Sequence, residues 1–195
     1  MSEHESVVDQ GPSSIRDMRI KIFSDGADID SILEARRAGL VRGFTTNPTL
    51  MAKAGVVNYL NFAREVLNQV KDLPVSFEVF SDEPEGMKKQ ALLLAGLAEN
   101  VYVKIPVTNT RRESTAELIH ALSHDGVKLN VTAVFSLRQV REIAGALSVN
   151  TPSVVSIFAG RIADTGRDPM PLMAEALRLL RISRPMSELL WASPR

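Results

Sequence analysis

The chain alternates two kinds of segment from about residue 18 to its last residue. Short runs rich in β-branched residues predict strands, and longer segments with helical spacing of apolar residues predict helices. The predicted strands are residues 19–24, 43–46, 75–80, 101–105, 127–134, 153–158 and 188–192. The predicted helices are residues 28–38, 58–70, 85–97, 110–123, 136–147 and 169–180. Such alternation requires parallel strands joined by right-handed crossovers, hence a doubly wound sheet or a (β/α) barrel.

Polar and ionisable residues gather where the predicted strands end, and this favours the barrel. In a barrel the carboxyl ends of all strands share the face that carries active sites, whereas an open sheet concentrates function at one switch point. The residues at these ends are Ser24, Asp25, Thr45, Thr46, Asn47, Glu78, Lys104, Asn130, Thr132, Ser156, Arg161, Ser193 and Arg195. We therefore predict an α/β fold of the (β/α)8 TIM-barrel type, with seven strands readable and the barrel truncated at its C-terminus.

Composition narrows the class of protein. The 195 residues include 23 basic and 23 acidic side chains, so no overall field favours nucleic acid or a membrane surface. The absence of cysteine excludes disulfides, thiolate metal sites and a cysteine nucleophile, and it fits a cytoplasmic protein. The longest apolar stretch, residues 91–98, is too short to cross a bilayer. We expect a flexible tail at residues 1–17 followed by one barrel domain at 18–195.

Lys104 is the most informative of these residues, because it lies inside the apolar segment 101–108. Burial disfavours the charged ammonium, and a neutral amine attacks carbonyl groups to form Schiff bases. The plainer alternative is a lysine on an edge strand, whose stem lies along apolar surface while its charge stays in water.

The other candidate residues also have plainer alternatives. Asp25-Gly26 fits a turn and Asn47-Pro48 fits a helix start. Glu78 could point into solvent, and Arg161 could be an ordinary surface residue. Thr132 and Ser156 could simply bond backbone groups. The three histidines, at positions 4, 120 and 124, lack metal-ligand spacing, so we expect no metal site.

Four short segments occur in a fixed order along the chain. They read Gly-Phe-Thr-Thr-Asn-Pro-Thr-Leu at residues 43–50, Val-Lys-Ile-Pro at 103–106, Leu-Asn-Val-Thr-Ala-Val-Phe at 129–135 and Ser-Ile-Phe-Ala-Gly-Arg at 156–161. With Asp25 in the first strand, they resemble the successive signatures of the transaldolases, in the short subfamily that includes fructose-6-phosphate aldolase. The resemblance implies a (β/α) barrel in which Lys104, at the end of the fourth strand, is the Schiff-base lysine.

The resemblance also implies a mechanism. Lys104 would attack the carbonyl of a ketose phosphate such as fructose 6-phosphate and form an imine that accepts electrons. Asp25 would remove the hydroxyl proton as the carbon–carbon bond breaks, and Glu78 with Thr132 would hold the water used in proton transfer. The dihydroxyacetone unit would then pass to an aldose such as erythrose 4-phosphate. No metal or organic cofactor is required, because the imine supplies the electron sink.

Further residues are implied to bind the substrate. Asn47 and Asn130 resemble residues that bind the sugar hydroxyls. Arg161, Ser193 and Arg195 would bind the phosphate, because guanidinium groups bind phosphate through paired hydrogen bonds and the late loops of such barrels commonly hold it. Glu78 and Phe158 favour a transaldolase, since the aldolase branch carries glutamine and tyrosine there. The full predicted binding set is Asn47, Thr45, Asn130, Ser156, Phe158, Arg161, Ser193 and Arg195.

The end of the sequence departs from the family, because an eight-stranded barrel requires one more strand and its helix. An unclosed barrel exposes the edges of its first and last strands. Our hypothesis is that the sequence is a fragment of a longer protein. Two alternatives stay open: a partner supplies the missing strand, or the protein is not a competent enzyme.

Two alternative functions also stay open. One is an aldolase that releases its aldehyde, and the other is a non-catalytic homologue. A homo-oligomer also stays open, since related short proteins assemble, partly through a C-terminal helix.

Overall fold

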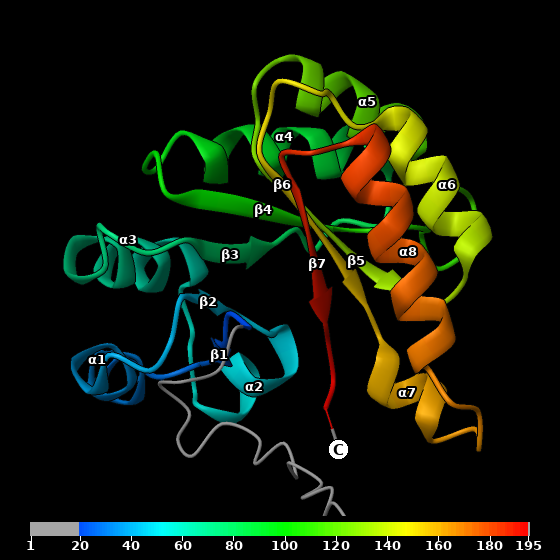
Figure 1. Ribbon diagram of the computed structural model, residues 1–195. Coiled ribbons are helices and arrows are strands. Elements are labelled where there is room, and N and C mark those ends of the chain that lie inside the picture. Colours follow the sequence, from blue (N-terminus) through cyan, green and yellow to red (C-terminus); the bar gives the residue numbers. More distant parts are fainter. Residues whose placement is uncertain (1–19, 195) are drawn as a thin grey trace, which may run out of the picture.

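The structure, a computed structural model, describes residues 20–194 (Figure 1). Seven strands form one parallel sheet, and they are paired in the order in which they occur along the chain. They are β1 (Phe23–Asp25), β2 (Gly43–Thr45), β3 (Val75–Glu78), β4 (Val101–Pro106), β5 (Leu129–Val134), β6 (Ser153–Ile157) and β7 (Ser187–Trp191). Within the described residues β1 and β7 are not paired, so the sheet is a curled half-barrel.

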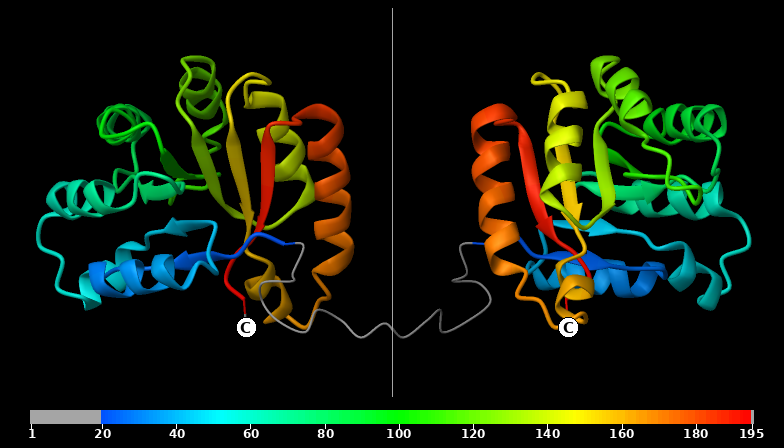
Figure 2. Two further views of the ribbon diagram at one scale, coloured as in Figure 1. Left: turned by 60° about the vertical axis from the view of Figure 1, so that its left-hand side comes forward. Right: turned by 90° about the vertical axis from the view of Figure 1, so that its right-hand side faces the viewer.

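Eight helices of the described part surround the sheet on its outer side, as the two views in Figure 2 show. They are α1 (Ile29–Ala38), α2 (Pro48–Lys53), α3 (Tyr59–Gln69), α4 (Pro84–Ala95), α5 (Ala116–His124), α6 (Leu137–Ala146), α7 (Ala159–Ala163) and α8 (Met170–Ser183). A doubly wound sheet has helices on both faces and a strand order that reverses. The prediction of a truncated (β/α) barrel, rather than a doubly wound sheet, is therefore confirmed. The predicted tail at residues 1–17 lies outside the described residues.

Local sequence explains where the predicted helices begin. The side chains of Asp28 and Asn58 accept hydrogen bonds from the backbone N–H three residues ahead, at the starts of α1 and α3. Ser136 forms a capping box with Gln139 at the start of α6. One boundary was wrong: the helix predicted from residue 110 begins at Ala116, because residues 109–115 form a turn.

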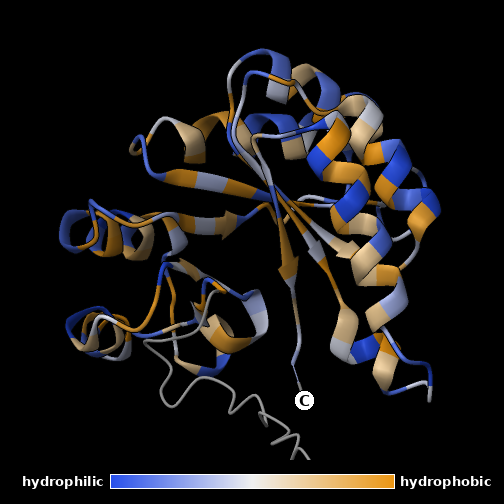
Figure 3. Cartoon of the chain, in the orientation of Figure 1, coloured by the Kyte–Doolittle hydropathy of each residue, from blue (hydrophilic) through white to orange (hydrophobic). Residues whose placement is uncertain are grey.

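Strand alternation separates an apolar outer face of the sheet from a polar interior. In β4, Val101, Val103 and Ile105 are buried, and Tyr102 and Lys104 alternate with them on the opposite face. The buried set packs against the helices and makes the main core. Figure 3 shows that the strands are largely apolar and that the helices around them are of mixed polarity. This alternation directs Lys104 into the half-barrel.

Candidate active site

Lys104 lies on an interior strand of the sheet, with β3 on one side and β5 on the other. Its amine Nζ lies 3.2 Å from Glu78 Oε2 and donates a hydrogen bond to the Thr46 backbone oxygen at 3.0 Å. The side chain is only 12% exposed. The alternative of an edge-strand lysine with its charge in water is therefore wrong.

Glu78 faces Lys104 because the two residues are direct partners in the β3–β4 ladder. Phe77 and Val79, on either side of Glu78, are buried on the helix side of the sheet, so Glu78 points inward. Its side chain is 21% exposed, and the alternative of an outward glutamate is wrong. A partly buried pair of this kind has less water around it than a surface pair, which strengthens the interaction.

A string of hydrogen-bonded side chains crosses the interior from β6 to β3. Ser156 Oγ donates to Asn130 Oδ1 at 2.7 Å, and Asn130 Nδ2 donates to Ser76 Oγ at 3.0 Å. All three residues are buried. Ser156 thus bonds a side chain rather than the backbone, and the string fixes which way the Asn130 amide faces. Asn130 is also the ladder partner of Lys104, so the string supports the strand next to the lysine.

Thr132 stands out because its buried hydroxyl has no hydrogen-bond partner among the described residues. Buried hydroxyl groups without a hydrogen-bond partner are rare in native proteins. At a candidate site, such a hydroxyl can bond a water molecule or a ligand. The strand is irregular just beyond it: the β5–β6 register shifts between Val131 and Val134, and Ala133 has a φ of 58°. Bulges of this kind redirect side chains next to active sites. The alternative in which Thr132 bonds the backbone is wrong.

Asp25 is the last residue of β1, and Asn47 lies two residues after the end of β2. Asp25 is exposed, and its Oδ1 accepts a hydrogen bond from Thr45 Oγ1 at 2.9 Å. Asn47 caps α2, because its Oδ1 accepts from the backbone N–H of Thr49 at 2.8 Å and of Leu50 at 3.3 Å. The helix-start reading of Asn47-Pro48 is thus correct, and only the amide nitrogen of Asn47 is left for other contacts.

The last described segment of the chain packs against α7. The backbone N–H of Gly160 donates to the Ala192 oxygen at 3.3 Å, and a Cβ on Gly160 would lie 1.4 Å from the Ser193 oxygen. Only a glycine fits this close approach. It brings Ser193 next to the start of the short helix that carries Arg161, whose side chain is 58% exposed. Arg195 lies outside the described residues.

Phe158 lies at the end of β6 and contacts one other aromatic ring. Phe135, at the end of β5, meets it edge to face with ring centroids 5.5 Å apart. Phe135 is exposed and Phe158 is half-buried, so the pair forms an apolar part of the rim beside Thr132.

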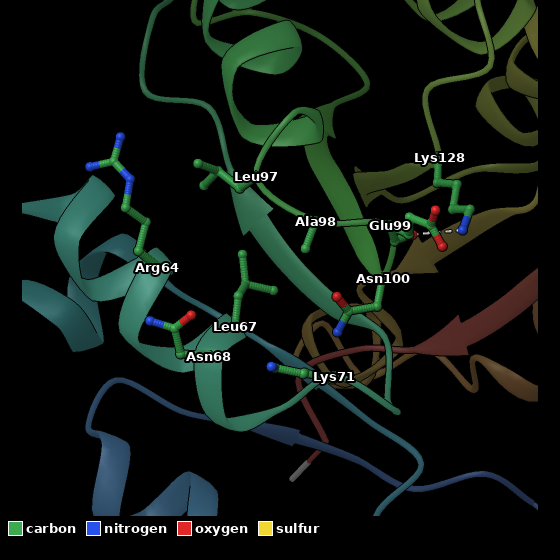
Figure 4. A pocket seen from close by; sticks show the side chains of 9 residues that line it. All are labelled: Arg64, Leu67, Asn68, Lys71, Leu97, Ala98, Glu99, Asn100 and Lys128. Carbon is green, nitrogen blue, oxygen red and sulfur yellow. Dashed lines mark hydrogen bonds between the residues drawn. The ribbon is translucent and has the colours of Figure 1, made fainter.

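Two hollows, of 610 and 370 Å³, lie at the opposite, amino-terminal end of the strands. Figure 4 shows the larger one, between α3 and the segment that leads into β4. Its polar groups bond mainly to the protein itself: Lys128 Nζ donates to the Glu99 oxygen at 2.7 Å, and Asn100 Nδ2 donates to the oxygens of Val70 and Leu73. None of the predicted site residues lines either hollow, so we assign the chemistry to the carboxyl end.

Sequence reasoning missed three residues that support the site. Thr46 appeared only as a polar strand end, although its backbone oxygen accepts from Lys104. Ser76 and Tyr59 were not singled out at all. The signal for Ser76 was its inward position two residues before Glu78; for Tyr59 the sequence offered none, because its contacts depend on how α3 packs. Over residues 20–194 we find no His, Cys, Asp or Glu cluster able to hold a metal and no helix able to span a membrane.

The candidate site thus combines a largely buried lysine with a glutamate at the carboxyl ends of two adjacent parallel strands. The sequence matches the family Transaldolase/Fructose-6-phosphate aldolase over residues 22–195, and the chain belongs to this family. Curated relatives named "Probable transaldolase" are 38% identical in Heliobacterium modesticaldum and 39% identical in Methanococcus maripaludis. Each match covers 90% of this chain and 77% of the relative.

Proposed function

We propose that the protein is a transaldolase that moves a dihydroxyacetone unit from a ketose phosphate to an aldose phosphate through a Schiff base on Lys104. The observation that carries the proposal is the placement of the Lys104 amine, which is largely buried and lies 3.2 Å from a carboxylate. A primary amine that has lost its proton keeps two N–H bonds and one lone pair. The Thr46 oxygen accepts one of these N–H bonds and the Glu78 carboxylate lies at ion-pair distance, so the two neighbours can orient the amine and leave its lone pair for an incoming carbonyl.

The chemical steps follow from this placement. The lysine nitrogen bonds to the ketose carbonyl carbon, and water leaves to give a protonated imine. The neighbouring carbon–carbon bond then breaks toward the imine, while a base removes the proton of the hydroxyl that becomes the released aldehyde. Asp25 is our candidate for this base, because it lies on the first strand beside Thr45. The enamine left on Lys104 adds to the acceptor aldose by the reverse steps, and water releases the product.

Glu78 and Thr132 are our candidates for handling the proton and the water. Glu78 is near enough to the amine to accept its proton, and the Thr132 hydroxyl has capacity for a water molecule. The sugar hydroxyls would meet Asn130, Ser156 and the amide nitrogen of Asn47. For the phosphate we propose Arg161 and Ser193, which the Gly160 contact brings together, with Arg195.

Borohydride trapping tests the proposal directly. The protein is incubated with fructose 6-phosphate and borohydride, and the modified peptide is located by mass mapping. We expect an adduct on Lys104 that Lys104→Met abolishes, with activity falling at least about a thousandfold. Lys21→Met is the matched control, because it removes a lysine from an exposed lysine–glutamate pair and should trap normally. A folded wild-type protein without any adduct would overturn the Schiff-base mechanism.

An aldolase that releases its aldehyde without transfer is the alternative within the same family. The two reactions are separated by measuring fructose 6-phosphate consumption with and without erythrose 4-phosphate. Consumption that requires the acceptor supports the transaldolase, whereas consumption at the same rate without it establishes the aldolase. A cytoplasmic location and a homo-oligomer remain predictions, which cell fractionation and light scattering test.

A further inference from the structure

Tyr59 connects helix α3 to the carboxyl end of β3. Its hydroxyl donates a hydrogen bond to the Glu78 backbone oxygen at 2.9 Å. Its ring lies edge-on to Phe77 and Phe80, with centroids 6.1 and 4.6 Å away. Burial raises the pKa of the Tyr59 phenol, which therefore remains a proton donor. The side chain is thus held in place by aromatic packing and fixes the backbone of a candidate catalytic residue.

The hydrogen bond from Tyr59 occupies a position that the sheet itself leaves open. Along the β2–β3 ladder, Phe44 N–H donates to the Pro74 oxygen, and Thr46 N–H donates to the Ser76 oxygen. Two residues further on, the donor in this series would be the nitrogen of Pro48, and its acceptor would be the Glu78 oxygen. Pro48 has no N–H and is already the first residue of α2, so no ladder donor reaches the Glu78 oxygen. The Tyr59 hydroxyl supplies the missing donor from outside the sheet.

The groups held in this way are the two acceptors of the Lys104 amine. One is the Glu78 carboxylate, and the other is the Thr46 oxygen. Thr46 is itself fixed, because its N–H and its hydroxyl both donate to the Ser76 oxygen at 3.0 Å. The Tyr59 phenol also lies near enough to the Thr46 side chain to affect the pKa of the phenol. Tyr59 therefore bonds the backbone of Glu78 and lies near Thr46, the two residues next to the amine, although it does not reach Lys104.

We propose that Tyr59 is a positioning residue, whose hydroxyl holds Glu78 and the end of β2 so that the Lys104 amine stays aligned for attack. The inference rests on the proposed function. Because Tyr59 lies behind the strand and does not face the interior, it should affect the rate of imine formation and leave sugar binding unchanged. Misalignment of a reacting group by a fraction of an ångström is enough to slow the step about tenfold.

Tyr59→Phe removes the hydroxyl and keeps the ring. The matched control is Tyr102→Phe, since the chain has two tyrosines and Tyr102 lies on the same strand as Lys104, half-buried and without a hydrogen bond among the described residues. Borohydride trapping at varied fructose 6-phosphate gives three quantities: the fraction of chains that react, the rate per reactive chain, and the half-saturating concentration. For Tyr59→Phe we expect a rate about tenfold lower with the other two quantities unchanged.

Each result bears on the proposal. A lower reactive fraction at an unchanged rate would mean that the hydroxyl only supports folding, and this would overturn it. Equal rates in Tyr59→Phe and wild type would also overturn it, as would an equal loss in Tyr102→Phe. Thr46→Val provides a second variant: if both hydroxyls act on the same amine, the double variant should be less impaired than the product of the two single effects.

A second measurement does not depend on any activity. Crystal structures of the wild type and of Tyr59→Phe give the distances from Lys104 Nζ to Glu78 Oε2 and to the Thr46 oxygen. We expect at least one of them to lengthen beyond hydrogen-bonding range in the variant, and unchanged distances would overturn the positioning role. Failure of wild-type trapping would instead overturn the proposed function, while these distances still decide the role of Tyr59.

Discussion

The half-barrel contains two lysine–glutamate pairs inside the same sheet, and they differ chiefly in burial. Lys104 and Glu78 are 12% and 21% exposed at the carboxyl ends of β4 and β3. Lys21, two residues before β1, and Glu188, near the start of β7, are 59% and 50% exposed, and their ion pair links the two edges of the sheet. Among residues 20–194, only the first has a second acceptor for the amine and an unpartnered hydroxyl on the neighbouring strand.

The comparison shows why residue type alone does not identify a functional lysine. An exposed ion pair competes with water and salt, so it contributes little to stability and leaves the lysine solvated. A largely buried amine interacts strongly with a few fixed neighbours, which can direct its hydrogen bonds and its lone pair. The fold thus makes a chemical site at one end of the sheet and an ordinary surface contact at the other.

Glu78→Gln tests the buried pair and should have the largest effect. The amide keeps the size of the side chain and removes its capacity to accept the amine proton. We expect kcat to fall about a hundredfold, with the fold retained in circular dichroism. A variant that keeps full kcat would show that the carboxylate takes no part in proton transfer.

Gly160→Ala tests the contact between α7 and the end of the chain. The added Cβ would clash with the Ser193 oxygen, so we expect a loss of about 1–3 kcal/mol in unfolding free energy. KM for the sugar phosphate should rise roughly tenfold, a change of about 1.4 kcal/mol. Gly145→Ala is the control, since a Cβ there meets nothing within 4 Å, and it should stabilise α6 by about 0.5–1 kcal/mol. Equal behaviour of the two variants would argue against the packing described here.

Glu188→Gln breaks the exposed pair and should have a small effect. We expect a change below about 1 kcal/mol in unfolding free energy, reduced further at high salt, and an unchanged kcat. Chemical denaturation at low and high salt measures it. A loss of several kcal/mol would mean that the contact between β1 and β7 holds the half-barrel together, and the two pairs would then differ less than we infer.

Asp82→Asn should change only how stability depends on pH. Hydrogen bonds from the side chain and backbone of Thr110 lower the pKa of the Asp82 carboxyl. A carboxyl with a lowered pKa in the folded state favours folding above its unfolded pKa, and this contribution disappears as pH falls through the folded pKa. The wild type should therefore exceed Asp82→Asn in stability at neutral pH, and the difference should vanish in strong acid. A difference independent of pH would contradict this assignment.

The positions of the strands and most helices were predictable, because each is determined largely by residues that are neighbours in the sequence. All seven strands were predicted within a few residues, and the caps at Asp28, Asn58 and Ser136 fixed three helix starts. The short helix α7 was missed, and α2 was anticipated only as a possible helix start at Asn47-Pro48, because one or two turns carry too little periodic signal. The late start of α5 was missed because the turn at residues 109–115 includes Arg112 at a positive φ, which apolar spacing does not reveal.

The sequence by itself determined that Lys104 lies in an apolar strand near its carboxyl end, and the two-residue period of a strand determined which neighbours share its face. Tertiary structure decided what surrounds its amine. The Thr46 oxygen comes from 58 positions away, and Asn130 bonds Ser76 across 54 positions. Such contacts depend on strand register and on where each helix packs, which are set by burial of the whole core rather than by any local segment.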